Sequence, residues 1–445
     1  AVQALTAAGL AEEGDRLAHV ERGLGRYRET PVSIVFGGGH PTFRPEEALA
    51  HGDYVFRGEA EEGFVPFLDA LFGAGEGGAS GAEEATAAGS NGAGGGSAEG
   101  CLDSIPGLSR WREGEAVHNP LPERWVDMDS LPTPNWELFE GFRSKIGGVM
   151  TSRGCPYNCS FCSVTAMLGR EYRMRSIEKI IDDLAATEAS HVFFYDDHFL
   201  ANPPRTRRLL ERIIEEKGRR IAVTDFSAQV RQNIAPPPAI LNLMKKADLN
   251  TLYIGFESVN RETLELYNKH QNLRQIVDSI REIKKRGLWI HGMFVLGSDA
   301  DREETFVETV KFAKKNKIDS VQFLILTPFP GTRQFREFEE EGRVISYDWS
   351  RYDGFQAVYI PRYLSPYRLQ LGTYRAMRRF YTWTRILSSL SRARLYQAAV
   401  RLYGNLSLKK WYRHNRRRLL RLKMDDRLLF APLLESGSAS ADGSS

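Results

Sequence analysis

The sequence contains little cysteine and no long apolar run. Only 4 of its 445 residues are Cys, which excludes a framework of disulfide bonds. The longest apolar runs, such as 321–326, are far shorter than the roughly 20 residues of a membrane-spanning helix. No basic segment followed by an apolar stretch marks a secretory signal near the first residue. These absences predict a cytoplasmic protein whose few thiols serve a site rather than cross-links.

Net charge is also small, but its distribution is uneven. The formal charge is +3, yet 17 Lys and Arg and no Asp or Glu lie between Pro361 and Met424, interleaved with Leu, Tyr and Trp. The rest of the chain carries a charge of −14. Three explanations of this basic segment are open: helices that pack an apolar stripe on the more acidic remainder, a surface for an anionic membrane or a lipid-linked substrate, and, least favoured, an RNA-binding surface.

One segment differs in composition from everything around it. Residues 73–100 contain 11 Gly in 28 positions and no large apolar side chain, which is typical of a flexible linker. We therefore expect a Rossmann-like segment, the linker, a connecting segment, a β/α barrel, a basic helical extension and a polar tail, over 1–72, 73–100, 101–146, 147–332, 333–434 and 435–445. The first residue is Ala rather than Met, and we expect the sequence to begin within a longer chain.

Strands and helices alternate regularly between Gly147 and Thr327. Apolar, β-branched segments predict strands over 148–151, 191–195, 222–226, 251–256, 289–296 and 320–326. Amphipathic segments predict helices over 177–189, 205–217, 238–246, 273–285 and 302–316. Repeated β/α units imply a parallel sheet with helices outside. Six units are fewer than the eight of a closed barrel, so the predicted fold class is α/β, a partial (β/α)6 TIM-like barrel with its chemistry at the carboxyl ends of the strands.

Three of the four cysteines lie within eight residues, directly after the first predicted strand. Cys155, Cys159 and Cys162 follow the spacing C-x3-C-x2-C. Thiolates are the ligands that iron–sulfur clusters require, and three of them leave one iron of a four-iron cluster open. A structural zinc site is the alternative, but it would need a fourth ligand. The nearest His residues, His191 and His198, come only after a helix and a strand.

This motif, with Phe161 between the last two cysteines, resembles that of the radical S-adenosylmethionine superfamily, and the resemblance covers about 147–332. It implies an enzyme in which Cys155, Cys159 and Cys162 hold a 4Fe–4S cluster, whose open iron binds the amino and carboxylate groups of S-adenosylmethionine. It also implies an electron donor of the flavodoxin or ferredoxin type. The cofactor would be cleaved reductively to methionine and a 5′-deoxyadenosyl radical, which abstracts hydrogen from the substrate.

The same resemblance implies contacts to S-adenosylmethionine at the strand ends. Tyr195, Asp196 and Asp197 follow the second strand, where relatives hydrogen-bond the amino group of the cofactor. The two carboxylates could accept from an ammonium, although a helix cap or a solvated turn explains either one equally well. Gln229 and Arg231 follow the third strand and would lie above the barrel.

Four further positions belong to this implied cofactor site. Glu257 ends the fourth strand, where the resemblance implies a contact to the ribose or methionine part. Lys269 is expected to pair with the cofactor carboxylate. Gly292 and Gly297 flank the fifth strand, which resembles the strand that meets adenine, and glycine would let a flat base approach the backbone.

A second resemblance concerns the N-terminal segment. Val32–Glu59, with Gly38-Gly39-His40 after an apolar strand, resembles the C-terminal half of a Rossmann-like cobalamin-binding domain. It implies cobalamin as a further cofactor and the cobalamin-binding class of the superfamily. The D-x-H-x-x-G motif that supplies the axial His in that family has no counterpart here, and neither does the first half of its sheet. We expect either a truncated sequence or a degenerated domain.

We expect these features to serve cobalamin-linked methyl transfer, or a related functionalisation of a C–H bond, on a small-molecule or lipid-like substrate. Two alternatives stay open. A cobalamin-independent tRNA methylthiotransferase carries three further cysteines in its N-terminal domain, whereas only Cys101 lies outside the motif here. A non-catalytic iron–sulfur or zinc protein that binds a polyanion would not need Asp196, Gln229 and Glu257 at strand ends. We do not expect a nucleic-acid partner, and we consider peripheral association with the inner face of the membrane.

Overall fold

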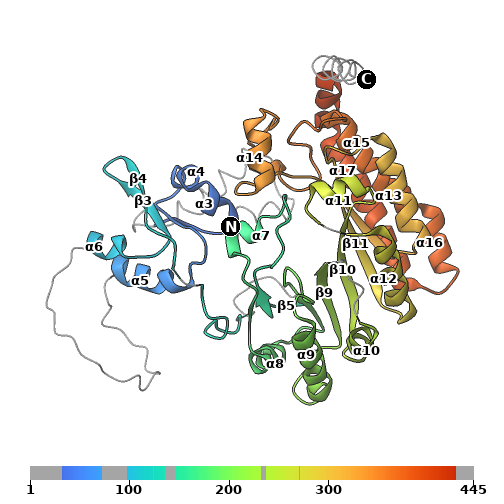
Figure 1. Cartoon of the computed structure of the whole chain (residues 1–445), viewed down its shortest axis with the longest axis horizontal. Coiled ribbons are helices and arrows are strands. Elements are labelled where there is room, and N and C mark those ends of the chain that lie inside the picture. Colours follow the sequence, from blue (N-terminus) through green and yellow to red (C-terminus); the bar gives the residue numbers. More distant parts are fainter. Residues whose placement is uncertain are drawn as a thin grey trace. The chain divides into compact units, whose positions relative to one another are not determined.

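The computed structural model describes residues 33–72, 98–123, 125–135, 146–231, 237–269 and 271–426 (Figure 1). The chain forms two compact units, Ala1–Asp127 and Met128–Ser445. Most of the predicted linker and the polar tail lie outside the described residues. Among the described helices, none combines the length and the apolar composition that crossing a bilayer requires.

The described part of the first unit is a four-stranded sheet with short helices. The strands pair in chain order: β1 (Val35–Phe36), β2 (Tyr54–Phe56), β3 (Leu108–Arg112) and β4 (Glu115–His118). The first pair is parallel, as in a Rossmann-like segment, and the next two pairs are antiparallel. The described helices are α3 (Gly39–Phe43), α4 (Pro45–Leu49), α5 (Glu61–Phe72) and α6 (Ala98–Asp103). Since β3 and β4 come from the predicted connecting segment, the first part of that segment belongs to this sheet.

A six-stranded parallel sheet forms the centre of the second unit. From one edge to the other its strands are β5 (Ile146–Val149), β8 (His191–Phe194), β9 (Asp225–Arg231), β10 (Leu249–Glu257), β11 (Trp289–Leu296) and β12 (Ser320–Ile325). Every neighbouring pair is parallel. The sheet stays open because β5 and β12 are its two edges. This confirms the predicted partial α/β barrel.

Helices cover the outer face of this sheet (Figure 1). They are α8 (Ile177–Ala186), α9 (Pro203–Glu216), α10 (Pro238–Lys246), α12 (Leu273–Lys285) and α13 (Glu303–Lys315). The side chains of Ser176, Asn202 and Asn272 each accept a backbone N–H at a helix start, which satisfies a donor that the helix itself leaves free. Shorter elements lie in the loops that follow β5 and β10: β6 (Ser152–Arg153), α7 (Val164–Leu168), β7 (Arg173–Met174) and α11 (Arg261–Leu266).

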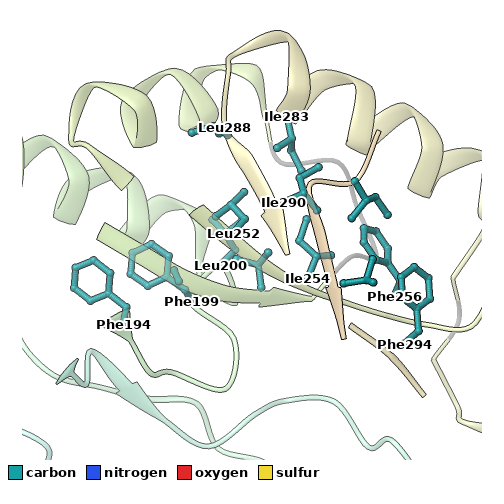
Figure 2. Packing of buried hydrophobic residues seen from close by; sticks show 14 of the residues in the cluster. Phe194, Phe199, Leu200, Leu252, Ile254, Phe256, Ile283, Leu288, Ile290 and Phe294 are labelled. Atoms are coloured by element: carbon teal, nitrogen blue, oxygen red, sulfur yellow. The ribbon is translucent and has the colours of Figure 1, made fainter. Parts of the chain in front are cut away.

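The core fills the space between the sheet and its helices. Phe194 stacks on Phe226 of the next strand, with ring centroids 5.4 Å apart. Phe294 contacts both Phe256 and Phe323 on the strands to either side of it. Figure 2 shows how side chains from strands and helices interleave in this layer. Because successive strand residues point to opposite faces, the concave face of the sheet is left to other side chains.

The third strand differs from the prediction over 222–226, because β9 runs over Asp225–Arg231. Apolar residues face the core at every second position from Phe226, and Ser227 and Gln229 alternate with them. These polar residues belong to the concave face. They interrupt the apolar pattern, so periodicity alone ends the strand too early.

The basic extension belongs to the second unit and packs on the barrel. Its helices are α14 (Arg333–Glu340), α15 (Pro366–Phe380), α16 (Trp383–Leu390) and α17 (Leu395–Asp425). The hydroxyl of Tyr381 donates to the carbonyl oxygen of Val321 at 2.7 Å and accepts from its N–H at 2.9 Å. Among the described residues, Arg368 is the only one of the 17 cations between Pro361 and Met424 that forms an ion pair, with Glu303. Apolar packing and hydrogen bonds therefore do most to attach the segment from Pro361 to Met424, while the other 16 of its cations form no ion pair with a described residue.

Gly297, directly after β11, is packed against the segment that leads into this extension. Its φ of +105° lies in the region that favours glycine, and a Cβ there would meet Tyr359 and Leu369. The Tyr359 hydroxyl also donates to the carbonyl oxygen of Gly297. The absence of a side chain at Gly297 therefore makes room for Tyr359 and Leu369.

We expect Gly297→Ala to lower the free energy of unfolding by about 2–4 kcal/mol, because strain at positive φ adds to overpacking. Chemical denaturation measures this loss. Gly342→Ala is the matched control, since Gly342 also has positive φ, at +67°, but nothing lies within 4 Å of a Cβ there. Its loss should be about 1 kcal/mol. Equal losses would show that contact with Tyr359 and Leu369 has no part in the effect.

Candidate functional site

The three cysteines lie on one loop beyond the carboxyl end of β5. Cys155, Cys159 and Cys162 follow β6 and precede α7, and all three side chains are partly exposed. Pro156 follows the first thiol directly, and no helix or strand forms across the motif. The loop is held instead by contacts with distant parts of the chain.

The residues that follow α11 hold the middle of this loop. The Ser160 hydroxyl donates to the carbonyl oxygen of Leu266 at 3.2 Å, and its backbone N–H donates to that of Tyr267 at 3.4 Å. The Asn268 side-chain amide donates to the carbonyl oxygen of Asn158 at 2.9 Å. The cysteine loop is thus fixed above the carboxyl end of β10, more than a hundred residues later in the chain.

Arg231, the last residue of β9, joins the cysteine loop to the rest of the site. Its Nη1 donates to Sγ of Cys159 at 3.0 Å, and its Nη2 donates to the carbonyl oxygen of Lys269 at 2.7 Å. The guanidinium lies over the Tyr157 ring, 3.9 Å from the ring centroid. A donated N–H and a nearby positive charge both favour the ionised form of a sulfur ligand. Arg231 is therefore placed to stabilise an anionic metal centre at Cys159.

The thiols form a soft donor set without a fourth protein ligand. Burial raises the pKa of Cys155 and raises that of Cys162 to about 12. Such thiols are protonated near neutral pH and release their protons when they bind a metal. Within the described ranges, no three His, Cys, Asp or Glu side chains gather closely enough to hold a single metal ion. Three thiols spread over one loop fit an iron–sulfur cluster and not a closed zinc site.

Asp196 is not available to a cofactor, contrary to the prediction. It is 2% exposed, and its carboxylate accepts hydrogen bonds from the backbone N–H and the hydroxyl group of both Thr151 and Ser152. Burial raises its pKa, while these hydrogen bonds oppose the shift. Since Thr151 and Ser152 follow β5, the carboxylate fixes the start of the cysteine loop against the end of β8. Its role is structural.

Asp197 and Tyr195 are open to the site. Tyr195 is exposed, and Asp197 is half-buried and accepts no hydrogen bond from any described residue. Burial, followed by the charge of Asp196, raises the pKa of Asp197 to about 6. The charge of Asp197 contributes in turn to the raised pKa of Cys155 and Cys162. Of the two adjacent aspartates, Asp197 is the one with a free carboxylate near the thiols.

The structure places the predicted site residues Glu257 and Lys269 together. Their side chains pair with each other. The Lys269 ammonium donates to the Glu257 carboxylate and, at 2.9 Å, to the carbonyl oxygen of Gly255. Both side chains are buried. Glu257 has a φ of +61°, a strained value for a non-glycine residue, and its carboxylate folds back over Gly255, where a Cβ would collide with it. Removal of either partner would leave a buried charge unpaired.

The other three predicted residues lie on different faces. Gln229 is half-buried on the concave face of β9, opposite Tyr253 in the register of β10. Gly292 directs its missing side chain toward apolar residues of the helix-covered face, where a Cβ would be crowded. Gly297 packs against Tyr359, as described above. At both glycines the space is filled by protein rather than left for a flat base, so the reason for assigning them to adenine is wrong.

Several residues of the site carry no signal in the sequence. The Tyr267 ring packs edge-on against Phe161, with centroids 4.9 Å apart. Nδ1 of His198 accepts from the backbone N–H of Arg231 at 3.2 Å, and burial lowers the pKa of His198 to about 3, which keeps the ring neutral. The partners of these residues lie 33 or more positions away in the chain. Only folding shows that they support the loop.

An open parallel α/β barrel with a loop of three thiols at its carboxyl edge defines a class of iron–sulfur enzymes. Residues 149–313 match the Radical SAM superfamily. The chain is 32% identical over 334 residues to an uncharacterized methyltransferase of Pyrococcus horikoshii, covering 72% of this chain and 66% of the relative. It is 26% identical to bacteriochlorophyllide d C-8(2)-methyltransferase of Chlorobaculum tepidum, covering 81% of this chain and 74% of the relative.

A solved structure agrees with this assignment at the level of the fold. The cobalamin-dependent S-adenosylmethionine radical enzyme OxsB has a TM-score of 0.57 and 16% identity, and the match covers 96% of this chain and 70% of that chain. The present chain belongs to the radical S-adenosylmethionine superfamily, whose members are enzymes that use a 4Fe–4S cluster and S-adenosylmethionine. It spans about two thirds of the length of the Pyrococcus relative, at 66%.

The raised pKa of Asp197 predicts a pH-dependent stability in cluster-free protein. The folded state favours the neutral carboxyl, so its contribution is lost as the pH rises from the unfolded value, about 4, through about 6. The difference in Tm, Asp197→Asn minus wild type, should therefore grow by about 2–4 °C between about pH 4.5 and about pH 7. Thermal unfolding at the two pH values measures it. The exposed Asp69→Asn variant should show no such growth; a flat difference for Asp197→Asn contradicts the prediction.

Proposed function

We propose that this chain transfers a methyl group, or carries out a related functionalisation of a C–H bond, on a small-molecule or lipid-like substrate. The observation that carries the proposal is the loop of Cys155, Cys159 and Cys162 at the carboxyl edge of an open barrel, with Arg231 bonded to Cys159 and Asp197 free beside it. The two relatives named as methyltransferases support the reaction class. The tetrapyrrole in one of those names supports a large, mainly apolar substrate.

The residues of the site hold and orient the reactants. The three thiolates would bind three irons of the cluster and leave the fourth without a protein ligand. When bound, the cluster and S-adenosylmethionine supply a 5′-deoxyadenosyl radical and methionine by one-electron reduction. Asp197 would accept hydrogen bonds from the ammonium of the cofactor, because its carboxylate is free and close to the thiols. Arg231 would keep the cysteine loop in place and offset its negative charge.

Cobalamin is a further cofactor in this proposal. The glycine loop after β1 is open, since Gly38 has a φ of +99° and nothing lies within 4 Å of a Cβ there. The neighbouring His40 lies 3.8 Å from the carboxylate of Glu47, and burial lowers its pKa. The axial D-x-H-x-x-G motif has no counterpart in the sequence. The residues present therefore fit the open loop of such a domain and do not supply a ligand to cobalt.

The proposal includes partners and a location. An electron donor of the flavodoxin or ferredoxin type would reduce the cluster from the carboxyl edge of the barrel, where the loop is partly exposed. A cytoplasmic location suits an oxygen-sensitive exposed cluster. The basic extension supports peripheral association with an anionic membrane, because 16 of the 17 cations between Pro361 and Met424 form no ion pair within the described residues.

Anaerobic reconstitution with iron and sulfide, followed by dithionite and S-adenosylmethionine, tests the function. We expect about four iron atoms per chain and formation of 5′-deoxyadenosine. Cys159→Ala should bring both close to background, whereas Cys101→Ala, which removes an exposed thiol outside the loop, should keep both. An isotope label in the methyl group of the cofactor, followed by mass spectrometry with tetrapyrrole and lipid acceptors, tests the transfer. A fully loaded cluster that forms no 5′-deoxyadenosine with any acceptor would contradict the proposal.

Arg231→Gln tests the contact to Cys159 through the cluster itself. The variant loses a donated N–H and a positive charge, so the reduced cluster is less stabilised. We expect a midpoint potential more negative by about 60 mV, the equivalent of one charge-assisted hydrogen bond of about 1.5 kcal/mol, with iron content unchanged. Titration followed by electron paramagnetic resonance measures the shift. Arg207→Gln, which removes an exposed arginine of α9, should leave the potential unchanged; an unchanged potential in Arg231→Gln would rule out the contact.

A further inference from the structure

A hollow lined with cations lies at the amino ends of β11 and β12. It has a volume of about 1610 Å³ and is formed by the ends of α12 and α13, the residues just before the two strands, α16 and the start of α17. Among the described residues, ten Lys and Arg line it against a single acid, Asp319. We call it the cationic hollow. The cysteine loop lies at the carboxyl ends of the strands, which we call the carboxyl edge, and the hollow lies at their amino ends, the amino edge. The two sites therefore lie at opposite ends of the strands.

Most of these cations are not neutralised. Lys284 pairs with Asp319 at 2.6 Å, while Arg281 and Lys285 pair with acids of their own helix. The other seven form no ion pair with any residue that the structure describes. They come from two places, the end of α13 with Lys314, Lys315 and Lys317, and the α16–α17 corner with Arg385, Arg392, Arg394 and Arg401.

The cations of the hollow repel one another. Arg401 is 8% exposed, its Nη1 donates to Oγ of Ser389 at 2.6 Å, and its Nε is buried without a partner among the described residues. Burial and the charge of Arg401 lower the pKa of Arg385 to about 10. Burial and the charges of Arg385 and Arg379 lower the pKa of Lys314. A shift in this direction means that the fold keeps positive charge together at a cost, which a bound anion would relieve.

An apolar ridge runs along α16, a helix whose other residues form one wall of the hollow. Trp383, Leu387 and Leu390 stand at i, i+4 and i+7, so they share one face of the helix, and they are 50%, 61% and 47% exposed. Leu395 and Tyr396, both exposed, line the hollow itself. The Lys409 ammonium lies 5.2 Å from the centroid of the Trp383 ring, so positive charge borders the ridge on α17 as well. Exposed apolar side chains and unpaired cations thus share α16 and the start of α17, with Leu395 and Tyr396 in the hollow and Lys409 at Trp383.

We propose that the α16 ridge and the cationic hollow together dock the protein on an anionic phospholipid bilayer. The ridge enters the headgroup region, and the hollow takes up lipid phosphate groups. Charge complementarity selects this partner, because unpaired cations beside exposed Trp and Leu are what an anionic interface stabilises. Nucleic acid also carries phosphate, but its bases stack on aromatic rings, and binding it would not bury the exposed leucines.

The inference deepens the membrane part of the proposed function and names the surface that performs it. It depends on residues at the amino edge of the sheet, so its failure would leave the radical chemistry at the carboxyl edge untouched. Docking at the amino edge also leaves the cysteine loop open to an electron donor.

Co-sedimentation of the 445-residue chain with vesicles tests the proposal. We compare phosphatidylcholine vesicles with vesicles in which about a third of the lipid is phosphatidylglycerol, at low and high salt. Wild type should bind the anionic vesicles only, and binding should fall with salt. Lys315→Gln/Arg392→Gln/Arg394→Gln removes three exposed, unpaired cations of the hollow. It should weaken partition at least about tenfold, since each charge near an anionic surface is worth roughly a fivefold change.

A second variant separates insertion from charge. Leu387→Gln/Leu390→Gln keeps every cation, so it should weaken partition while leaving its salt dependence in place. The matched control, Lys179→Gln/Arg208→Gln/Lys246→Gln, removes the same charge from exposed positions on α8, α9 and α10 and should bind as wild type does. Cluster loading and 5′-deoxyadenosine formation verify that each variant is folded.

Four outcomes would overturn the proposal. Equal binding to both vesicle types, or equal loss in the control variant, would show that the surface is not specific. Release of the protein from vesicles by inorganic pyrophosphate, added at the phosphate concentration of the lipid, would assign the hollow to a soluble anion. Tighter binding to RNA that the hollow variant abolishes would assign it to nucleic acid. A dimer that Leu387→Gln/Leu390→Gln dissociates would assign the ridge to a second copy of the chain.

Discussion

The common direction of the six central strands is the constraint on which the site depends. Because all strands run the same way, their carboxyl ends meet at one edge, and segments as far as 110 positions apart become neighbours there. Arg231 uses this proximity, since one guanidinium bonds Cys159, 72 residues earlier, and the backbone of Lys269, 38 residues later. Without parallel strands, the thiols would lie on an isolated loop with no partner to hold it.

The same constraint separates two kinds of electrostatic environment. The carboxyl edge gathers thiols, a free carboxylate and one bridging guanidinium, which suits a metal centre with a bound amino acid group. The amino edge gathers ten cations, seven of which form no ion pair with a described residue, and this suits an external anion. Burial acts at both edges by disfavouring charge: it raises the pKa of Asp197, Cys155 and Cys162, and it lowers that of Arg385.

The residues predicted for the site differ in whether the fold already pairs their side chains. The spacing of Cys155, Cys159 and Cys162 and the strand before them are local features, and they identified the loop. Asp196 and Asp197 are adjacent in sequence, yet the carboxylate of Asp196 accepts hydrogen bonds from Thr151 and Ser152, whereas that of Asp197 is free. Such a difference depends on donors brought in from another strand, which no local pattern reports.

The sequence by itself determined the alternation of strands and helices, the bounds of β11, α10 and α12, the thiol motif and the uneven charge, because each of these depends on residues close together in the chain. Only the tertiary structure decided which side chains are already paired. It joined Glu257 to Lys269, filled the space at Gly297 with Tyr359, and left the cations of α16 and α17 without acids. The physical reason is that pairing and burial depend on distance in space, and distance in space follows from packing.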